Sequence, residues 1–155
     1  MEKAVLVGIN YSSQTNAQTK EFLDELAFLA LTSGAKMVKK FTQSLNVAHS
    51  TTFFGKGKLI EIEYFVKENE IDLVIFDDDL TPSQLRNIEK QLCCKILDRS
   101  NLIYKQIRGI RKTFNLPPDP NQDLHLTLHM INFNYNHPFM KKYDILNKLK
   151  NYIKH

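Results

Sequence analysis

Apolar and polar residues follow two different periods along the first hundred residues of the chain. A continuous apolar run over residues 3–9 is typical of a strand that is buried on both faces. Residues 16–33 then carry apolar side chains at helical spacing, and Gly34 is the expected end of that helix. Further strands are predicted at residues 36–45, 71–76 and 94–98, and further helices at about 57–69 and from Thr81-Pro82 to Leu92. Strands that alternate with helices predict an α/β fold: a small four-stranded, mainly parallel sheet flanked by helices.

The pattern weakens beyond about residue 104, where Pro117, Pro118 and Pro120 exclude a continuous helix. The charge changes at the same place. Residues 1–100 hold 12 Lys and Arg against 14 Asp and Glu, whereas residues 101–155 hold 9 against 3. We therefore expect an α/β domain at residues 1–103 and an irregular basic tail at residues 104–155, partly helical or disordered.

Composition narrows the class of protein. The 155 residues are 43% hydrophobic and 25% charged, as in an ordinary globular domain, and no apolar run approaches the length of a membrane span. The apolar run near the N-terminus is too short for a signal peptide, so we expect a cytoplasmic protein. Cys93 and Cys94 are adjacent and cannot close a relaxed disulfide, so they are expected to be reduced thiols that enter a buried strand.

Two segments invite a chemical interpretation. Gly55-Lys56-Gly57-Lys58 precedes a predicted helix, where backbone amides attract anions, but it lacks the spacing of a nucleotide-binding loop. Asp77, Asp78 and Asp79 follow a central strand, at the edge where α/β sheets bind ligands, and clustered carboxylates can hold Mg²⁺. A solvated acidic loop before a capped helix is the other interpretation. The spacing of His125 and His129 resembles that of a helical metal pair, but no Glu lies between them as in HExxH, and no metal site is expected.

Three longer motifs are not generic. They are Phe53-Phe54-Gly55-Lys56-Gly57-Lys58-Leu59-Ile60-Glu61-Ile62, the run from Asp72 to Lys90 that contains Asp77-Asp78-Asp79-Leu80-Thr81-Pro82-Ser83-Gln84-Leu85-Arg86-Asn87, and Lys95-Ile96-Leu97-Asp98-Arg99-Ser100-Asn101-Leu102-Ile103. Over residues 3–103 their order and spacing closely resemble the N-terminal domain of HflX-type GTPases. The positions that carry the resemblance are Gly55, Gly57, Lys58, Glu61, Asp77, Asp78, Pro82, Gln84, Arg86, Asn87, Asp98 and Arg99.

The resemblance implies a four-stranded parallel α/β domain that, in the family, precedes a two-helix arm and a G domain. It implies docking on the large ribosomal subunit and contact with its RNA. GTP and Mg²⁺ are cofactors of the full-length family, but this sequence contains no GxxxxGK[ST] motif, so we expect no cofactor and no GTPase activity from this chain alone.

Candidate contacts with nucleic acid are the basic residues near the motifs and after residue 103, because phosphates attract Lys and Arg. They are Lys56, Lys58, Arg86, Arg99, Lys105, Arg108, Arg111 and Lys112. Two alternatives to a docking domain stay open. One is an inactive remnant of a frameshifted GTPase gene, with an out-of-frame reading after about residue 103. The other is a magnesium-dependent module that uses Asp77 to Asp79.

Overall fold

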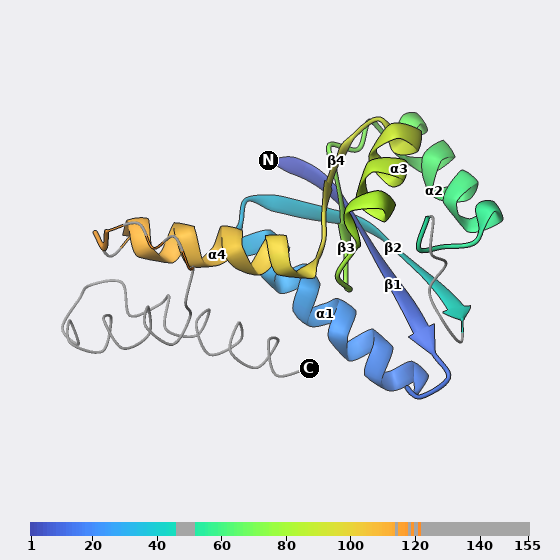
Figure 1. Ribbon diagram of the computed structural model, residues 1–155, viewed down its shortest axis with the longest axis horizontal. Helices are drawn as coiled ribbons and strands as arrows, with labels where there is room; N and C mark the ends of the chain where they lie inside the picture. Colours follow the sequence, from blue (N-terminus) through green and yellow to red (C-terminus); the bar gives the residue numbers. More distant parts are fainter. Residues whose placement is uncertain (46–51, 114, 118, 120, 122–155) are drawn as a thin grey trace.

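The computed structural model describes residues 1–45, 52–113, 115–117, 119 and 121. Four strands alternate with four helices in this part of the chain (Figure 1). The elements are β1 (Glu2–Tyr11), α1 (Asn16–Thr32), β2 (Ala35–Leu45), α2 (Lys56–Glu68), β3 (Leu73–Phe76), α3 (Pro82–Leu92), β4 (Lys95–Leu97) and α4 (Arg99–Thr113). The predicted α/β class and the order of its elements are confirmed.

The four strands form one parallel sheet in the order β2-β1-β3-β4. The longest pairing joins β1 to β2, from Glu2 opposite Ala35 to Tyr11 opposite Leu45. One irregularity interrupts it, because Ala4 pairs with Met37 and Val5 pairs with Lys39. Strand β1 is therefore central, and successive side chains along it point to opposite faces of the sheet.

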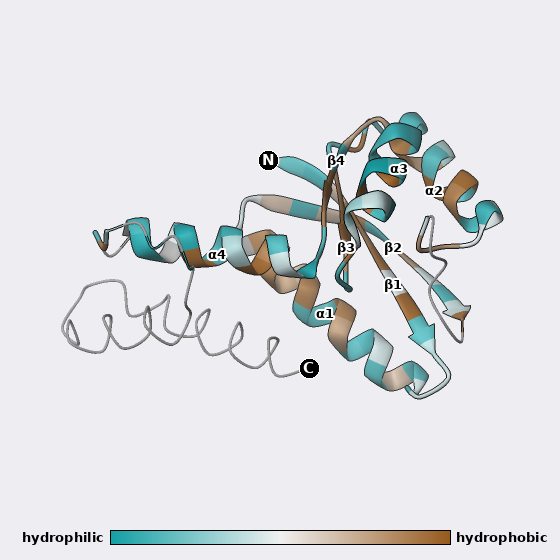
Figure 2. Ribbon diagram, viewed as in Figure 1, coloured by the Kyte–Doolittle hydropathy of each residue, from teal (hydrophilic) through white to brown (hydrophobic). Residues whose placement is uncertain are grey.

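Both faces of the sheet are covered by helices, which explains why β1 is apolar and buried from Ala4 to Ile9. Ala4 and Leu6 pack in a cluster with α1 and α4, whereas Val5, Val7 and Ile9 pack in a second cluster with α2 and α3. Figure 2 shows the apolar residues concentrated in the strands and in bands along α1. A strand that is buried on both faces has no polar side to alternate with.

Local sequence signals begin the helices where expected. Thr15 and Thr81 accept hydrogen bonds from the backbone N–H groups of Gln18 and Gln84, and each glutamine side chain accepts one from the threonine backbone in return. This reciprocal arrangement satisfies two backbone donors that a helix start would otherwise leave without partners. Pro82 occupies the first turn of α3, where a missing N–H costs nothing.

Helix α4 differs from the expectation, because the boundary proposed at residue 103 falls inside it. Leu102, Ile103 and Ile107 continue the apolar spacing of a helix, and Gln106 and Ile107 are buried against α1. Ten residues beyond the proposed boundary are thus part of the folded unit. Most of the expected tail, residues 122–155, lies outside the described residues.

The two cysteines differ in their surroundings. Cys93 is exposed and ends α3 in the left-handed conformation, with φ of 53°. Cys94 is half-buried, and burial raises the pKa of its thiol to about 11. Only Cys94 therefore fits the expected placement at the start of a buried strand. In the residues that the structure describes, no helix is long and apolar enough to cross a membrane.

Candidate functional site

The carboxyl ends of β1 and β3 meet at the point where the strand order reverses. From β1 the chain crosses to β2 on one side and then returns to β3 on the other side. In open α/β sheets such a reversal leaves a crevice in which ligands bind. The Asp77 N–H donates to the Val7 carbonyl at 2.9 Å, which fixes the loop after β3 beside β1. The first candidate site is therefore the carboxyl-edge cluster: Tyr11, Asp77, Asp78, Asp79 and Arg99.

Electrostatics single out one carboxyl in the carboxyl-edge cluster. Burial, together with the charges of Asp77 and Asp79, raises the pKa of Asp78 to about 7, and Arg99 opposes this rise in part. Burial and the charge of Asp78 together raise the pKa of Tyr11 to about 12. A carboxyl with a pKa near neutrality marks a candidate for proton-linked chemistry, although structural clusters also produce such shifts.

The other carboxylates of this region begin helix α4. The Asp79 carboxylate accepts from the backbone N–H of Ser100 at 3.0 Å and from its hydroxyl at 2.6 Å. The Asp98 carboxylate accepts from the Asn101 N–H at 3.0 Å and, on its second oxygen, from the Leu80 N–H at 3.1 Å. Within the described part of the chain no three His, Cys, Asp or Glu residues are grouped as metal ligands. Asp79 and Asp98 therefore act as caps for the first turn of α4.

The glycine-rich segment is the start of α2 and not a loop around a ligand. Gly55 is the residue before the helix, and its N–H donates to the Gln43 side chain at 3.1 Å. Lys58 forms an ion pair with Glu61 at 3.2 Å, one turn further along α2. Lys56 is exposed. A Cβ at Gly57 would meet no atom within 4 Å, so steric crowding does not explain that glycine.

Some of the family-motif residues on α3 have a structural role at the start of the helix, and others lie further along it. Pro82 and Gln84 begin the helix, and Gln84 is buried while its side chain accepts from the Thr81 N–H at 2.9 Å. Arg86 is exposed and Asn87 is half-buried on the turn that follows. Of these residues, only Arg86 presents its charge to solvent.

The eight expected nucleic-acid contacts do not form one patch. Lys56 and Lys58 lie at the start of α2, Arg86 on α3, and Arg99 at the start of α4 beside Asp78. Arg111 departs from the expectation. Its side chain is only 5% exposed, and its Nε donates to the Pro117 carbonyl at 2.8 Å, so it fastens the turn after α4 instead of facing a partner.

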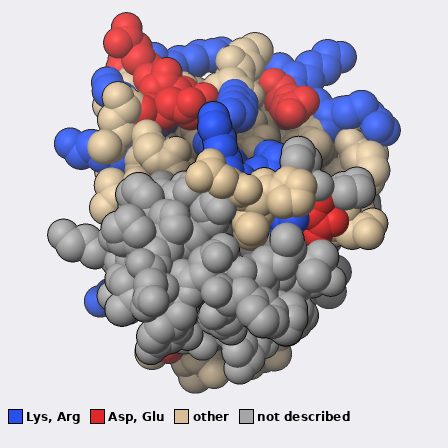
Figure 3. Space-filling view, turned by 90° about the vertical axis from the view of Figure 1, so that its left-hand side faces the viewer, with Lys and Arg blue, Asp and Glu red and all other residues tan. Residues whose placement is uncertain are grey.

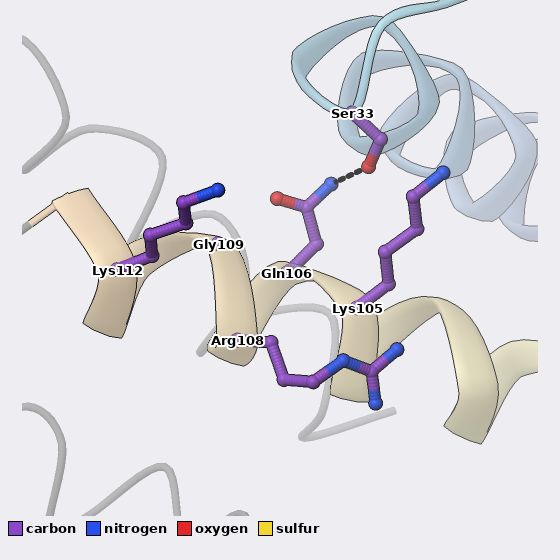
Figure 4. Close-up of a pocket in the computed structure, with 6 residues that line it drawn as sticks. All are labelled: Ser33, Lys105, Gln106, Arg108, Gly109 and Lys112. Atoms are coloured by element: carbon purple, nitrogen blue, oxygen red, sulfur yellow. Dashed lines mark hydrogen bonds between the residues drawn. The ribbon is translucent and has the colours of Figure 1, made fainter. Parts of the chain in front are cut away.

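The remaining three basic residues line one pocket. Lys105, Arg108 and Lys112 border a hollow of about 380 Å³ together with Ser33, Gln106 and Gly109. The pocket, which we call the α1–α4 pocket, lies between the C-terminal end of α1 and the side of α4 (Figure 4). Figure 3, which turns this side of the molecule toward the viewer, shows Lys and Arg side chains interspersed with acidic ones among the described residues.

Sequence reasoning missed Ser33 and Gln106. The Gln106 amide donates to the Leu29 carbonyl at 2.6 Å and also to the Ser33 hydroxyl. Ser33 and Gln106 are separated by 73 residues. A contact at that separation leaves no periodic signal, and Gln on a helix is ordinarily read as a solvated side chain.

Comparison with known proteins gives matches of two kinds. The family model described as GTP-binding GTPase N-terminal matches residues 20–105. The GTPase HflX of Flavobacterium psychrophilum is 49% identical over 102 residues, covering 66% of this chain and 25% of that protein. The GTPase HflX of Escherichia coli is 36% identical over 102 residues, covering 66% of this chain and 23% of that protein. The chain thus spans about a quarter of the length of these curated relatives.

A solved structure agrees at the level of the fold. A GTP-binding protein from the archaeon Sulfolobus solfataricus, crystallised with GDP, aligns with a TM-score of 0.54 at 18% identity, over 99% of this chain and 43% of that chain. The likeness at this identity concerns the fold alone. The family model covers more than half of the chain and agrees with the HflX relatives over the same residues. The chain therefore belongs to the GTP-binding GTPase N-terminal family, as the N-terminal domain of HflX-type GTPases.

Proposed function

We propose that this chain is a docking domain that binds the large ribosomal subunit through its RNA. The observation that carries the proposal is the family match over residues 20–105, because the HflX-type family is one that associates with ribosomes. A ribosomal partner would place the protein in the cytoplasm. GTP hydrolysis belongs, in this proposal, to the G domain of the full-length family.

The charge on α4 supports an RNA partner. The helix carries five Lys and Arg residues and no Asp or Glu over Arg99–Thr113. Arg108 and Lys112 are exposed and Lys105 is half-buried, so three of these charges are available to a partner. Lysine and arginine that neutralise RNA phosphates release bound counterions, which makes such binding strongly dependent on salt.

Co-sedimentation of the full chain with purified large ribosomal subunits tests docking. We expect binding that weakens steeply between about 50 and 200 mM salt. Replacing Lys105, Arg108 and Lys112 by Gln should weaken binding and lower the slope of log affinity against log salt by about 3. A matched control replaces three exposed lysines outside α4, Lys36, Lys90 and Lys95, by Gln.

The control variant should bind nearly as the wild type does, although it loses the same number of charges. Equal weakening of both variants would mean that the net charge of the protein, and not the position of the charges on α4, determines the affinity. An affinity for the large subunit that changes neither with salt nor with the α4 substitutions would contradict an electrostatic RNA contact. It would favour docking through apolar surface.

We further infer that Gly55–Lys58 does not hold GTP in this chain. The segment forms the first turn of α2, and the Lys58 ammonium is engaged by Glu61 at 3.2 Å. A phosphate-binding loop instead directs its lysine and its backbone amides at the β- and γ-phosphates. Equilibrium dialysis with GTP and Mg²⁺ should detect no saturable binding. Saturable micromolar binding that Lys58→Gln removes would overturn this inference.

A further inference from the structure

Among the six residues that line the α1–α4 pocket, three are basic and none is acidic. Lys105, Arg108 and Lys112 line the pocket and are spaced three and four residues apart, so each lies within about one helical turn of the next. Neither residues 26–36, which include the end of α1, nor residues 99–113 contain Asp or Glu. Like charges at such spacing repel each other, and an anion among them would relieve that repulsion.

The wall of the pocket is held in place by hydrogen bonds. The Gln106 amide donates to the Leu29 carbonyl at 2.6 Å and to the Ser33 hydroxyl, and that hydroxyl donates to the same carbonyl at 3.2 Å. These contacts bridge the last turn of α1 to the middle of α4. The polar lining therefore keeps its geometry without a ligand, as in a preformed binding site.

The side chains around the pocket have distinct directions. In Figure 4, Lys105 and Lys112 extend on the same side of α4 as Gln106, whereas Arg108 extends on the other side, at the rim. Gly109 lies between them and contributes no side chain, and a Cβ there would meet no atom within 4 Å. The pocket is thus open at its centre because of a glycine.

Compensation of the α1 helix dipole accounts for only part of this arrangement. The C-terminal end of α1 carries partial negative charge and has no basic residue in its own last turn, so Lys105 can serve that role. The dipole effect falls off within one turn, and Lys112 lies about two turns further along α4. At least one of the two lysines is therefore left for another anion.

We propose that the α1–α4 pocket binds a phosphate group between Lys105 and Lys112, with Arg108 at the rim. The proposal deepens the docking function and rests on it for the source of the phosphate, which is the backbone of RNA. A free phosphate anion shares the same chemistry, and the experiment separates the two sources.

Thermal unfolding of the full chain, with inorganic phosphate against chloride at equal ionic strength, tests the pocket. Phosphate should raise the Tm of the wild type, because a ligand that binds only the folded state stabilises it. Lys105→Gln with Lys112→Gln should weaken the apparent affinity for phosphate roughly tenfold or more. Lys36→Gln with Lys95→Gln is the control that loses the same charge elsewhere, and it should keep the full effect.

A second variant blocks the pocket without changing charge. Gly109→Met places a side chain where open space lies, and methionine favours helix more than glycine does, so this variant should fold. It should lose the phosphate effect although all three basic residues remain. A phosphate effect of equal size in the wild type, the double variant and Gly109→Met would overturn the pocket.

Binding of a fluorescent single-stranded RNA, measured by anisotropy, identifies the source. Displacement of the RNA by inorganic phosphate, together with weaker RNA binding by both variants, supports an RNA phosphate. Equal RNA affinity in all proteins would overturn the RNA source and leave a site for free phosphate. If the wild type does not co-sediment with the large subunit but keeps the phosphate effect, the docking proposal fails and the phosphate site stands. The experiments therefore distinguish failure of the docking function from failure of the pocket.

Discussion

Asp78 is the residue whose ionisation the fold disfavours most clearly. It lies in the carboxyl-edge cluster with Asp77 and Asp79 on its own loop, Tyr11 from β1 and Arg99 from α4. Its folded-state pKa of about 7 exceeds the ordinary value of 3.8. The folded state therefore binds the Asp78 proton more tightly than the unfolded state does. Its contribution to stability is complete below about pH 4 and is lost as pH rises to 7.

We predict that Asp78→Asn removes this loss. The variant should match the wild type near pH 4 and exceed it above pH 7 by an amount on the order of 1–2 kcal/mol, after allowance for partial exposure. Urea unfolding at several pH values measures the difference. Parallel stability profiles of the two proteins would show that Asp78 ionises normally.

Gln106 is the residue that joins α1 to α4. Its amide donates to the Leu29 carbonyl at 2.6 Å in a buried setting, and truncation would leave that carbonyl without this donor. We predict that Gln106→Ala lowers the free energy of unfolding by about 1–1.5 kcal/mol, the net contribution of a buried hydrogen bond. Arg108→Ala, an exposed position on the same helix, is the control and should change stability by less than about 0.5 kcal/mol. Equal effects at the two positions would contradict the role assigned to Gln106.

Single residues were predictable where their role is local. Thr81 and Pro82 reveal a helix start because the cap and the first turn are neighbours in the sequence. Arg111 was not predictable in this way. A charged residue on a basic helix reads as solvated, and only the returning chain at Pro117 shows why its guanidinium is buried.

Among the elements, α4 depends on carboxylates from two separate loops. Asp79 follows β3, whereas Asp98 follows β4, and both accept from backbone N–H groups in the first turn of α4. We predict that Asp79→Ala and Asp98→Ala each lower the free energy of unfolding by about 1 kcal/mol, because each removes a helix cap. Urea unfolding of the two variants measures these losses.

The control for the capping prediction is Glu68→Ala, which removes an exposed carboxylate at the end of α2. It should leave the urea midpoint nearly unchanged. An Asp79 variant as stable as this control would mean that Asp98 alone begins α4.

The strands and the first three helices could be predicted because each has a strong period and a clear end signal. The extent of α4 could not, because the resemblance to known proteins stops near residue 103 while the helix does not. Leu102, Ile103 and Ile107 carry the helical spacing across that point. The end of α4 is a local turn, in which Asn115 has a φ of 55° and the Leu116 N–H donates to the Arg111 carbonyl at 2.8 Å.

At the scale of the whole molecule, residues 104–113 complete the core on one face of the sheet. Ile107 is 2% exposed and belongs to the cluster that contains Leu6, Leu26 and Leu102. We predict that a chain ending at residue 103 is less stable than one ending at residue 121 by about 2–5 kcal/mol, the cost of removing a large buried side chain. Equal urea midpoints would place the end of the folded unit at residue 103.

The central position of β1 affects the order in which the sheet can form while the chain is being synthesised. Strand β1 is made first, but its partner β3 lies far along the chain. The Lys3 backbone N–H, for example, donates a hydrogen bond to the Asp72 carboxylate, which is 69 residues away. At a synthesis rate of about 5–20 residues per second, β1 waits roughly 3–14 seconds for that partner. During this interval β1 can pair only with β2, and its other edge stays open. The nascent chain is therefore exposed to misassociation along this largely apolar strand, before the residues that close the sheet have been made.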